Sequence, residues 1–206
     1  MITKEIFRKK AKKKLKLIAK TKAKCSHYEI LRNLKKIIKT TNSKKILFFM
    51  PMANEPNLLL LRRKLAKSNE IFIPLMRNLS FEMVKLRGPF YKSRFGILEN
   101  RSQNAFKKQI DLAVVPVIGV DGKMARIGHG MGFYDRFFDN LNYKPLIIFV
   151  EICDMYIKET ISQKHDIKCD IYLTPKKNYL IRGKNDRNNS RLRSRCSGSW
   201  CRISDI

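Results

Sequence analysis

Three glycines at alternate positions, Gly128, Gly130 and Gly132, stand directly before an acidic and a basic residue in the segment RIGHGMGFYDRFF (residues 126–138). A backbone without side chains exposes its amide N–H groups, and such groups at the start of a helix can hold phosphate. The spacing Gly-x-Gly-x-Gly is neither the dinucleotide fingerprint nor a Walker loop. From the glycines alone, a plain loop and a phosphate cradle are therefore about equally supported.

The charged residues around these glycines favour a phosphate site. Arg126 can neutralise a phosphate group with a bidentate guanidinium. Asp135 falls in the first turn of an expected helix, where its carboxylate suits Mg²⁺ better than phosphate itself. The alternative for Asp135 is that it only stabilises the positive end of the helix dipole. Arg136 can either pair locally or reach a ligand.

The elements that must position these residues follow from the apolar pattern. Helices are expected over residues 4–17, 26–39, 57–68, 132–141 and 154–162, and strands over 44–51, 70–76, 79–86, 111–120, 145–150 and 169–175. Continuous apolar strands that alternate with helices indicate a parallel sheet covered on both faces. We therefore predict a single α/β domain, a three-layer sandwich with a mostly parallel, Rossmann-like sheet. Ligands in such folds bind beyond the carboxyl ends of the strands.

Composition narrows the class of protein. The chain has 206 residues, of which 44% are hydrophobic, enough for one domain with a real core. No run of eighteen apolar residues occurs, and the N-terminus lacks the pattern of a secretory signal, so we expect a cytoplasmic protein that does not bind membranes. The five cysteines form no Cys-x-x-Cys pair, which disfavours a disulfide framework and a zinc site.

The net charge of +28 is distributed unevenly along the chain. Residues 1–45 carry +15, residues 176–206 carry +7, and the body between them carries only +6. Residues 1–180 are therefore predicted to form the α/β domain, and the basic, Arg/Ser-rich residues 181–206 to form a disordered tail. Weak RNA binding by this tail is an alternative, although its composition favours a solvated appendage.

The segment DLAVVPVIGVDGKMARIGHGMGFYDRFF (residues 111–138) resembles the signature of the 5-formyltetrahydrofolate cyclo-ligase family, also called 5,10-methenyltetrahydrofolate synthetase. The matching residues are Pro116, Asp121, Gly122, Arg126, Gly128, Gly130, Gly132, Tyr134, Asp135 and Arg136. Phe133 replaces the first tyrosine of the family pattern, and Met131 stands where glycine or lysine is usual. Because a lysine there would touch phosphate, this loop must rely more on its backbone amides.

Three further stretches fall in the order of that family. FFMPMANEPNLLLL resembles a strand followed by the glutamate that contacts the pterin, which would be Glu55, with Met50 on the wall of the same pocket. KSRFGILEN resembles the Gly-Ile-x-Glu loop, in which the preceding aromatic, Phe95, would stack on folate. KHDIKCDIYLTP resembles the closing stretch, in which Asp166 would join Asp135 in supporting Mg²⁺.

The N-terminal helix gains a second interpretation from this resemblance. Family members present a lysine and an arginine four residues apart to the ATP phosphates, and Lys4 with Arg8 has that spacing on one helical face. Because the lysines are so dense, the pair Arg8 and Lys12 is an alternative, as is a plain solvated face. His129 can hydrogen-bond phosphate, but the family accepts many residues there, which favours a spectator.

The resemblance implies an enzyme that uses ATP and Mg²⁺ to cyclise 5-formyltetrahydrofolate to 5,10-methenyltetrahydrofolate. It implies that Arg126, Tyr134 and Asp135 are catalytic and that Met50, Glu55, Phe95 and Tyr134 bind the folate. The ATP-binding residues would be Lys4, Arg8, Arg126, Gly128, His129, Gly130, Met131, Gly132, Phe133 and Tyr134, and the metal ligands Asp135 and Asp166. We expect a monomer and a substrate that carries a polyglutamate tail attracted by surface lysines.

The competing class is a nucleic-acid-binding protein that uses the cationic N-terminal helix and the Arg/Ser-rich tail. It predicts salt-sensitive binding without sequence preference, and deletion of the tail should abolish that binding but spare the cyclo-ligase activity. No RNA-recognition, helix-turn-helix or zinc-finger pattern is visible in the sequence, so we do not expect nucleic acid as a partner.

Overall fold

The computed structural model describes residues 2–21, 23–77, 79–92, 96, 98–100, 104–181, 196 and 198–203. Within these residues the centre of the protein is an eight-stranded sheet. Its strands, in spatial order, are β12 (Ser199–Ile203), β11 (Lys177–Ile181), β10 (Ile171–Leu173), β9 (Leu146–Val150), β6 (Leu112–Pro116), β1 (Lys45–Leu47), β2 (Glu70–Arg77) and β3 (Ser80–Lys85). Two small ribbons pair β4 (Phe90–Lys92) with β5 (Leu98–Asn100), and β7 (Gly119–Val120) with β8 (Arg126–Ile127).

The sheet is mostly parallel, as predicted. β2, β1, β6, β9 and β10 run in the same direction, whereas β3 pairs antiparallel with β2, and β11 pairs antiparallel with β10. Every residue of β6 is buried, because layers cover both faces of the central strands. This burial explains why the strand reads as a continuous apolar run in the sequence.

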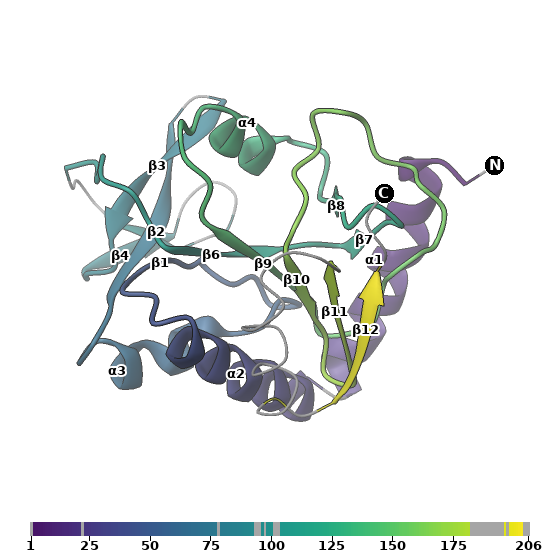
Figure 1. Ribbon diagram of the computed structural model, residues 1–206, viewed down its shortest axis with the longest axis horizontal. Coiled ribbons are helices and arrows are strands. Elements are labelled where there is room, and N and C mark those ends of the chain that lie inside the picture. Colours follow the sequence, from purple (N-terminus) through teal and green to yellow (C-terminus); the bar gives the residue numbers. More distant parts are fainter. Residues whose placement is uncertain are drawn as a thin grey trace.

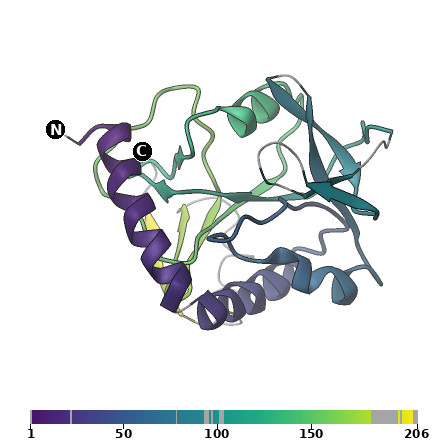
Figure 2. The ribbon, with the colours of Figure 1, turned by 180° about the vertical axis from the view of Figure 1, so that it is seen from behind.

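Helices form the outer layers (Figures 1 and 2). One face carries α2 (Ala23–Thr40), the 3₁₀-helix η1 (Leu58–Leu61) and α3 (Arg62–Leu65), and the other face carries α4 (Phe133–Asp139). Two separate cores result, one that includes Ile30 and Leu34 of α2 and one that includes Phe137 of α4. The predicted fold, a single α/β domain with a sheet between two layers, is therefore confirmed.

The N-terminal helix α1 (Lys4–Thr21) lies near β7 and β8 rather than over the middle of the sheet (Figures 1 and 2). Phe7, Ala11 and Leu15, spaced four residues apart, form its buried stripe and pack in one cluster with Ile118 and Ile127. The remaining surface of α1 is dominated by lysines. Among the helices that the structure describes, none has the length and apolar character that a membrane crossing requires.

The predicted helix over residues 154–162 is wrong. Apart from a bridge between Tyr156 and Val120, this segment has no regular structure, because neighbouring loops take up its backbone groups. The carboxylate of Asp121 accepts the N–H groups of Ile161 and Ser162 at 3.1 and 2.9 Å. An amphipathic spacing alone does not reveal such competing partners.

The prediction of a disordered tail is wrong for residues 199–203. They form β12, which pairs parallel with β11 at the edge of the sheet, and Cys196 is buried near α2. Residues 182–195, 197 and 204–206 lie outside the described part of the chain, so the domain boundary at residue 180 stays a prediction. Deletion of residues 181–206 would remove an edge strand as well as basic residues, and the sparing of activity by that deletion is therefore no longer expected.

Candidate functional site

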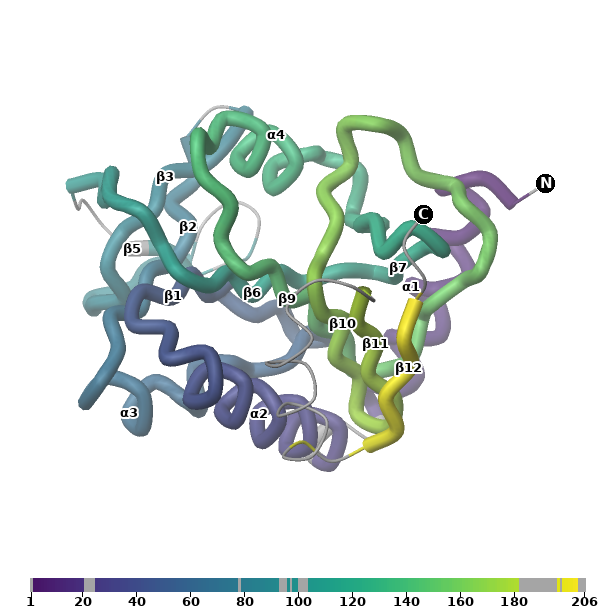
Figure 3. Tube along the Cα trace, in the orientation of Figure 1, coloured from purple at the N-terminus to yellow at the C-terminus, as the bar shows by residue number. Residues whose placement is uncertain are grey.

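The glycine loop of residues 128–132 begins beyond the carboxyl end of β6, where a parallel sheet places its ligands. Figure 3 follows the chain from β6 through β7 and the loops beyond it to α4. Asp121 fixes the intervening turn, since its Oδ1 accepts the N–H groups of Lys123 and Ala125, each at 3.0 Å. The loop then ends at Gly132, whose φ of +65° favours glycine, and α4 starts at the next residue.

Arg126 lies at the centre of the site and is only 7% exposed. Its Nε donates to the carbonyl of Pro116 at 3.2 Å, its Nη1 lies 3.5 Å from Oδ2 of Asp135, and its Cζ lies 4.9 Å from the ring centre of Tyr134. A Cβ atom on residue 128 would lie 2.2 Å from Nη1 of Arg126, so Gly128 leaves the space that the guanidinium fills. Glycine at position 128 thus allows the guanidinium of Arg126 to lie close to the backbone.

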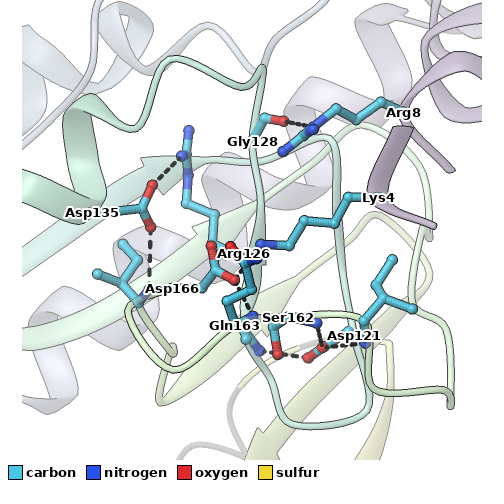
Figure 4. A network of polar contacts seen from close by, with 12 residues as sticks. Lys4, Arg8, Asp121, Arg126, Gly128, Asp135, Ser162, Gln163 and Asp166 are labelled. Carbon is cyan, nitrogen blue, oxygen red and sulfur yellow. Dashed lines mark hydrogen bonds and ion pairs between the residues drawn. The ribbon is translucent and has the colours of Figure 1, made fainter. Parts of the chain in front are cut away.

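The structure brings Lys4 and Arg8 of α1 to the same place (Figure 4). Nε of Arg8 donates to the carbonyl oxygen of Gly128 at 2.8 Å, and Nζ of Lys4 forms an ion pair with Asp166. Asp166 also accepts the N–H of Gln163 at 2.5 Å. The predicted register of the pair therefore places both cations within the polar network that includes the loop.

Asp135 and Asp166, the two predicted metal ligands, belong to one polar network (Figure 4). Oδ1 of Asp135 accepts the N–H of Ile167, the residue after Asp166, at 3.2 Å. Each carboxylate has a cationic partner, Arg126 for Asp135 and Lys4 for Asp166. Among the described residues, no three His, Cys, Asp or Glu side chains gather into a metal cage.

A cavity of about 270 Å³ adjoins the loop. Its walls include Met50 and Glu55 from the segment after β1, and Pro74, Met76 and Phe81 from β2 and β3. The lining also includes Arg126 and the predicted loop residues His129, Met131, Gly132, Phe133 and Tyr134. Apolar and aromatic side chains with a few polar groups are typical of sites for flat organic ligands.

Two carboxyl groups face this largely apolar cavity. Glu55 is 5% exposed, and its Oε2 accepts the N–H of Met52 at 2.9 Å. Burial raises the pKa of Glu55 to about 7, against smaller opposing effects of that hydrogen bond and of Arg126. Glu99 on β5 is 6% exposed and accepts a hydrogen bond from the hydroxyl of Tyr91 at 3.3 Å.

Several pocket residues were missed by the sequence analysis. Glu99 stood within the Gly-Ile-x-Glu stretch, but the aromatic before the glycine received the assignment instead. That aromatic, Phe95, lies outside the described residues, so its predicted stacking stays a prediction. Phe81 contacts the ring of Tyr134 edge-on at 5.0 Å, and the alternation of polar and apolar residues over 80–83 was the available indication that its side chain points inward.

His129 cannot supply positive charge at neutral pH. Desolvation and the charges of Lys12, Arg126 and Arg8 lower the pKa of His129 to about 4. The neutral imidazole can still donate or accept a hydrogen bond. Met131 is 59% exposed at the mouth of the cavity, and its side chain brings no charge to the loop. Positive charge near the loop therefore comes from lysine and arginine side chains, namely Lys4, Arg8, Lys12 and Arg126.

We expect the raised pKa of Glu55 to make folding stability depend on pH. In the folded protein the Glu55 carboxyl keeps its proton up to about pH 7, whereas in the unfolded chain it loses the proton at its usual pKa of 4.5. The protonated carboxyl therefore stabilises the fold fully below pH 4.5, and this stabilisation is lost as pH rises through 7. The loss amounts to roughly 3 kcal/mol. Circular-dichroism melting at pH 5 and pH 8 should show a smaller difference for Glu55→Gln than for the native protein.

Glu82 provides the control for this experiment, because its carboxylate is exposed and pairs with Arg77 on the surface of β3. Glu82→Gln should keep the native difference between the two pH values. An equal difference in Glu55→Gln and the native protein would refute the assignment of this pH dependence to Glu55.

Comparison with known sequences places the chain in a family. A sequence model of the 5-formyltetrahydrofolate cyclo-ligase family matches residues 1–175. A 5-formyltetrahydrofolate cyclo-ligase of Mycolicibacterium smegmatis is 29% identical over 140 residues, which span 63% of this chain and 72% of that protein.

Two solved structures have a similar fold. The 5,10-methenyltetrahydrofolate synthetase of Aquifex aeolicus superposes with a TM-score of 0.75 at 23% identity, over 90% of this chain and 96% of that one. The synthetase of Mycoplasma pneumoniae gives 0.68 at 18% identity, over 85% and 100% of the two chains. Because the family match spans the glycine loop, the cavity and both aspartates, the chain belongs to the 5-formyltetrahydrofolate cyclo-ligase family and is a ligase.

Proposed function

We propose that the protein converts 5-formyltetrahydrofolate to 5,10-methenyltetrahydrofolate with ATP and Mg²⁺, and releases ADP and phosphate. The observation that carries this proposal is the shared wall between the glycine loop and the apolar cavity, formed by Met131, Gly132, Phe133 and Tyr134. A phosphate donor on the loop and a flat acceptor in the cavity would meet at this wall. Such proximity is the main demand of phosphoryl transfer.

The cavity suits the folate. Met50 and the ring of Tyr134 offer apolar surface to the pterin, and Phe95 remains the proposed stacking partner beyond the described residues. The carboxyl group of Glu55 can bond to N–H groups of the pterin, and the pKa near 7 allows it to accept or donate a hydrogen bond at neutral pH. The role in pterin binding that the resemblance implies for Glu55 is thus compatible with its burial.

The loop side suits the nucleotide. The amides of residues 128–133, together with Lys4, Arg8 and Arg126, would bind the phosphates. Mg²⁺ takes one or two carboxylates along with phosphate oxygens and water, so Asp135 and Asp166 form a fitting donor set. Bound with ATP, Mg²⁺ supplies positive charge to the phosphate oxygens. In the structure Lys4 and Arg126 supply that positive charge to the two carboxylates.

The chemistry requires a better leaving group than the formyl oxygen. Transfer of the γ-phosphoryl group to that oxygen breaks the bond to ADP and gives an imidate phosphate. The neighbouring nitrogen of the same folate then attacks the imidate carbon, loses its proton, and expels phosphate to close the ring. The protein contributes positioning and charge neutralisation, with Arg126, Asp135 and Tyr134 nearest to the reacting groups.

The test is a spectroscopic assay with purified protein, 5-formyltetrahydrofolate, ATP and Mg²⁺. The near-ultraviolet absorbance of 5,10-methenyltetrahydrofolate should rise only when all three are present. Omission of ATP, and replacement of Mg²⁺ by excess EDTA, are the controls for the two parts of the proposal. Absence of ATP-dependent product from correctly folded protein would exclude the proposed reaction.

We also propose that the exposed lysines of α1 attract a polyglutamate tail on the substrate. Lys12 lies close enough to His129 at the cavity mouth to lower the pKa of the imidazole, and Lys13 and Lys16 are exposed on the same helix. Replacing Lys12, Lys13 and Lys16 by glutamine should raise KM about tenfold for a polyglutamylated substrate and less than twofold for the monoglutamate.

The matched control replaces Lys35 and Lys39, two exposed lysines of α2 on another part of the surface. This change should alter neither KM value. Equal effects of the α1 substitutions on the polyglutamylated and monoglutamylated substrates would contradict the proposal, because a general loss of charge or stability does not distinguish tail length.

The described residues of a single chain supply both the loop and the cavity walls, which supports a monomeric enzyme. Sedimentation equilibrium should then give a mass near 24.2 kDa. The cytoplasm is the proposed location.

A further inference from the structure

Arg136 makes contacts that neither the phosphate loop nor the folate cavity explains by itself. Its Nη2 donates to the carbonyl oxygen of Met131 at 2.6 Å, and its Nε donates to the carbonyl oxygen of Leu79 at 2.5 Å. Met131 belongs to the glycine loop, and Leu79 belongs to the turn between β2 and β3. One guanidinium thus joins two segments that are more than fifty residues apart in the sequence.

One of these segments lies in the lining of the cavity, and the other connects two strands that line it. The glycine loop is the proposed ATP wall, whereas Met76 and Phe81, on either side of the β2–β3 turn, line the proposed folate wall. α4, which carries Arg136, packs against β3, with Phe81 stacked on Phe137 at 4.1 Å (Figure 1). The contact between α4 and the strands of the β2–β3 hairpin is therefore apolar. Arg136 adds a polar contact to the turn of that hairpin.

The local backbone is shaped for this link. Gly132 has a φ of +65°, and a Cβ atom there would lie 2.9 Å from Nη1 of Arg136. The guanidinium carbon also lies 5.6 Å from the ring centre of Phe133. Lysine has the same charge but lacks the planar fork that reaches two carbonyl groups at once. The geometry requires an arginine rather than any cation.

We propose that Arg136 is a positioning residue that holds the glycine loop at a fixed place relative to the folate wall. Its guanidinium keeps Met131 and Gly132 next to the β2–β3 turn before ATP binds. The loop amides are therefore already ordered, and the nucleotide does not have to order them. Preorganisation of this kind lowers the cost of binding. The effect on catalysis rests on the proposed function, whereas the effect on loop order does not.

The first experiment measures loop order in the free protein. Backbone ¹⁵N relaxation of the native protein should give order parameters near 0.85 for the amides of residues 129–132, typical of rigid backbone. In Arg136→Ala these values should fall to about 0.6 or below, as in flexible loops. Arg77→Ala is the matched control, because Arg77 is an exposed arginine of the same hairpin and its side chain pairs with Glu82.

The second experiment measures nucleotide binding and turnover. Isothermal titration with Mg²⁺ and a non-hydrolysable ATP analogue should give a Kd about three- to tenfold higher for Arg136→Ala than for the native protein. The Kd for 5-formyltetrahydrofolate should change less than threefold, and kcat should fall about tenfold because the reacting groups are no longer aligned. Arg136→Lys, which can reach one carbonyl group, should lie between the two proteins.

The outcomes separate this inference from the proposed function. Native order parameters throughout residues 129–132 in Arg136→Ala would overturn it, and so would a loss of order spread over the whole sheet, which indicates a structural role. If the native protein has no cyclo-ligase activity, the proposed function fails, but the relaxation experiment still decides the role of Arg136. If Arg136→Ala does not fold, Arg136→Lys is compared with the native protein by the same measurements.

Discussion

Asp135→Asn should lower kcat about 100- to 1,000-fold while the protein stays folded. Asparagine keeps an oxygen that can accept the N–H of Ile167, which now bonds to Oδ1 of Asp135 at 3.2 Å. It removes the negative charge that faces Arg126, and with it one of the two carboxylates proposed to support Mg²⁺. In the proposed mechanism the chemical step should suffer most, because charge would develop on the transferred phosphoryl group next to this position.

The measurement combines kcat, its dependence on Mg²⁺ concentration, and the thermal unfolding midpoint. Asp135→Asn should require more Mg²⁺ for half-maximal rate, and Asp166→Asn should do the same. Asp139→Asn is the matched control, since Asp139 is an exposed aspartate near the end of the same helix. A variant that retains more than a tenth of the native kcat with an unchanged Mg²⁺ requirement would remove Asp135 from the proposed metal site.

Local patterns in the sequence, together with the family resemblance, were sufficient to predict which residues of the candidate site lie close together. The four-residue spacing of Lys4 and Arg8 set both side chains on one face of α1, and the buried stripe of Phe7, Ala11 and Leu15 turned the helix so that they reach the polar network. The glycine loop could likewise be placed, because it follows a buried strand whose carboxyl end is the usual ligand edge. Periodicity determines such features within one element.

Features that depend on distant partners could not be predicted in the same way. The helical spacing of residues 154–162 was misleading because Asp121, more than thirty residues away, takes the N–H groups of Ile161 and Ser162. The strand β12 follows a basic, Arg/Ser-rich stretch, and only its pairing with β11 makes it part of the sheet. The sequence left open whether Arg136 pairs locally or reaches a ligand, because the carbonyl of Leu79 comes close to it only in the folded hairpin.

The second large effect concerns stability, and we expect it for Asp121→Asn. Asp121 is fully buried, and its two carboxylate oxygens accept four backbone N–H groups, from Lys123, Ala125, Ile161 and Ser162. Asparagine offers one oxygen, which can serve two of these groups, and turns an NH₂ toward the other two. Each buried N–H left without an acceptor costs about 1–3 kcal/mol, so the free energy of unfolding should fall by roughly 2–6 kcal/mol.

Such a loss is a large part of the 5–15 kcal/mol that typically stabilises a domain, and for a chain of this size it corresponds to a midpoint lower by roughly 5–20 °C. It should also lower activity, because the same carboxylate ties the turn before Arg126 to the segment before Asp166 (Figure 4). Urea unfolding followed by circular dichroism measures the first effect, and the spectroscopic assay measures the second.

Asp111→Asn is the control for this prediction, since Asp111 also accepts backbone N–H groups, those of Lys44 and Lys45 at 2.6 and 2.9 Å, but is exposed. Both bonds go to a single oxygen, which an asparagine amide oxygen can replace, and water can solvate what remains. The control should therefore cost less than about 1 kcal/mol. If the two variants unfold at the same urea concentration, the four buried hydrogen bonds to the Asp121 carboxylate do not contribute the predicted stability.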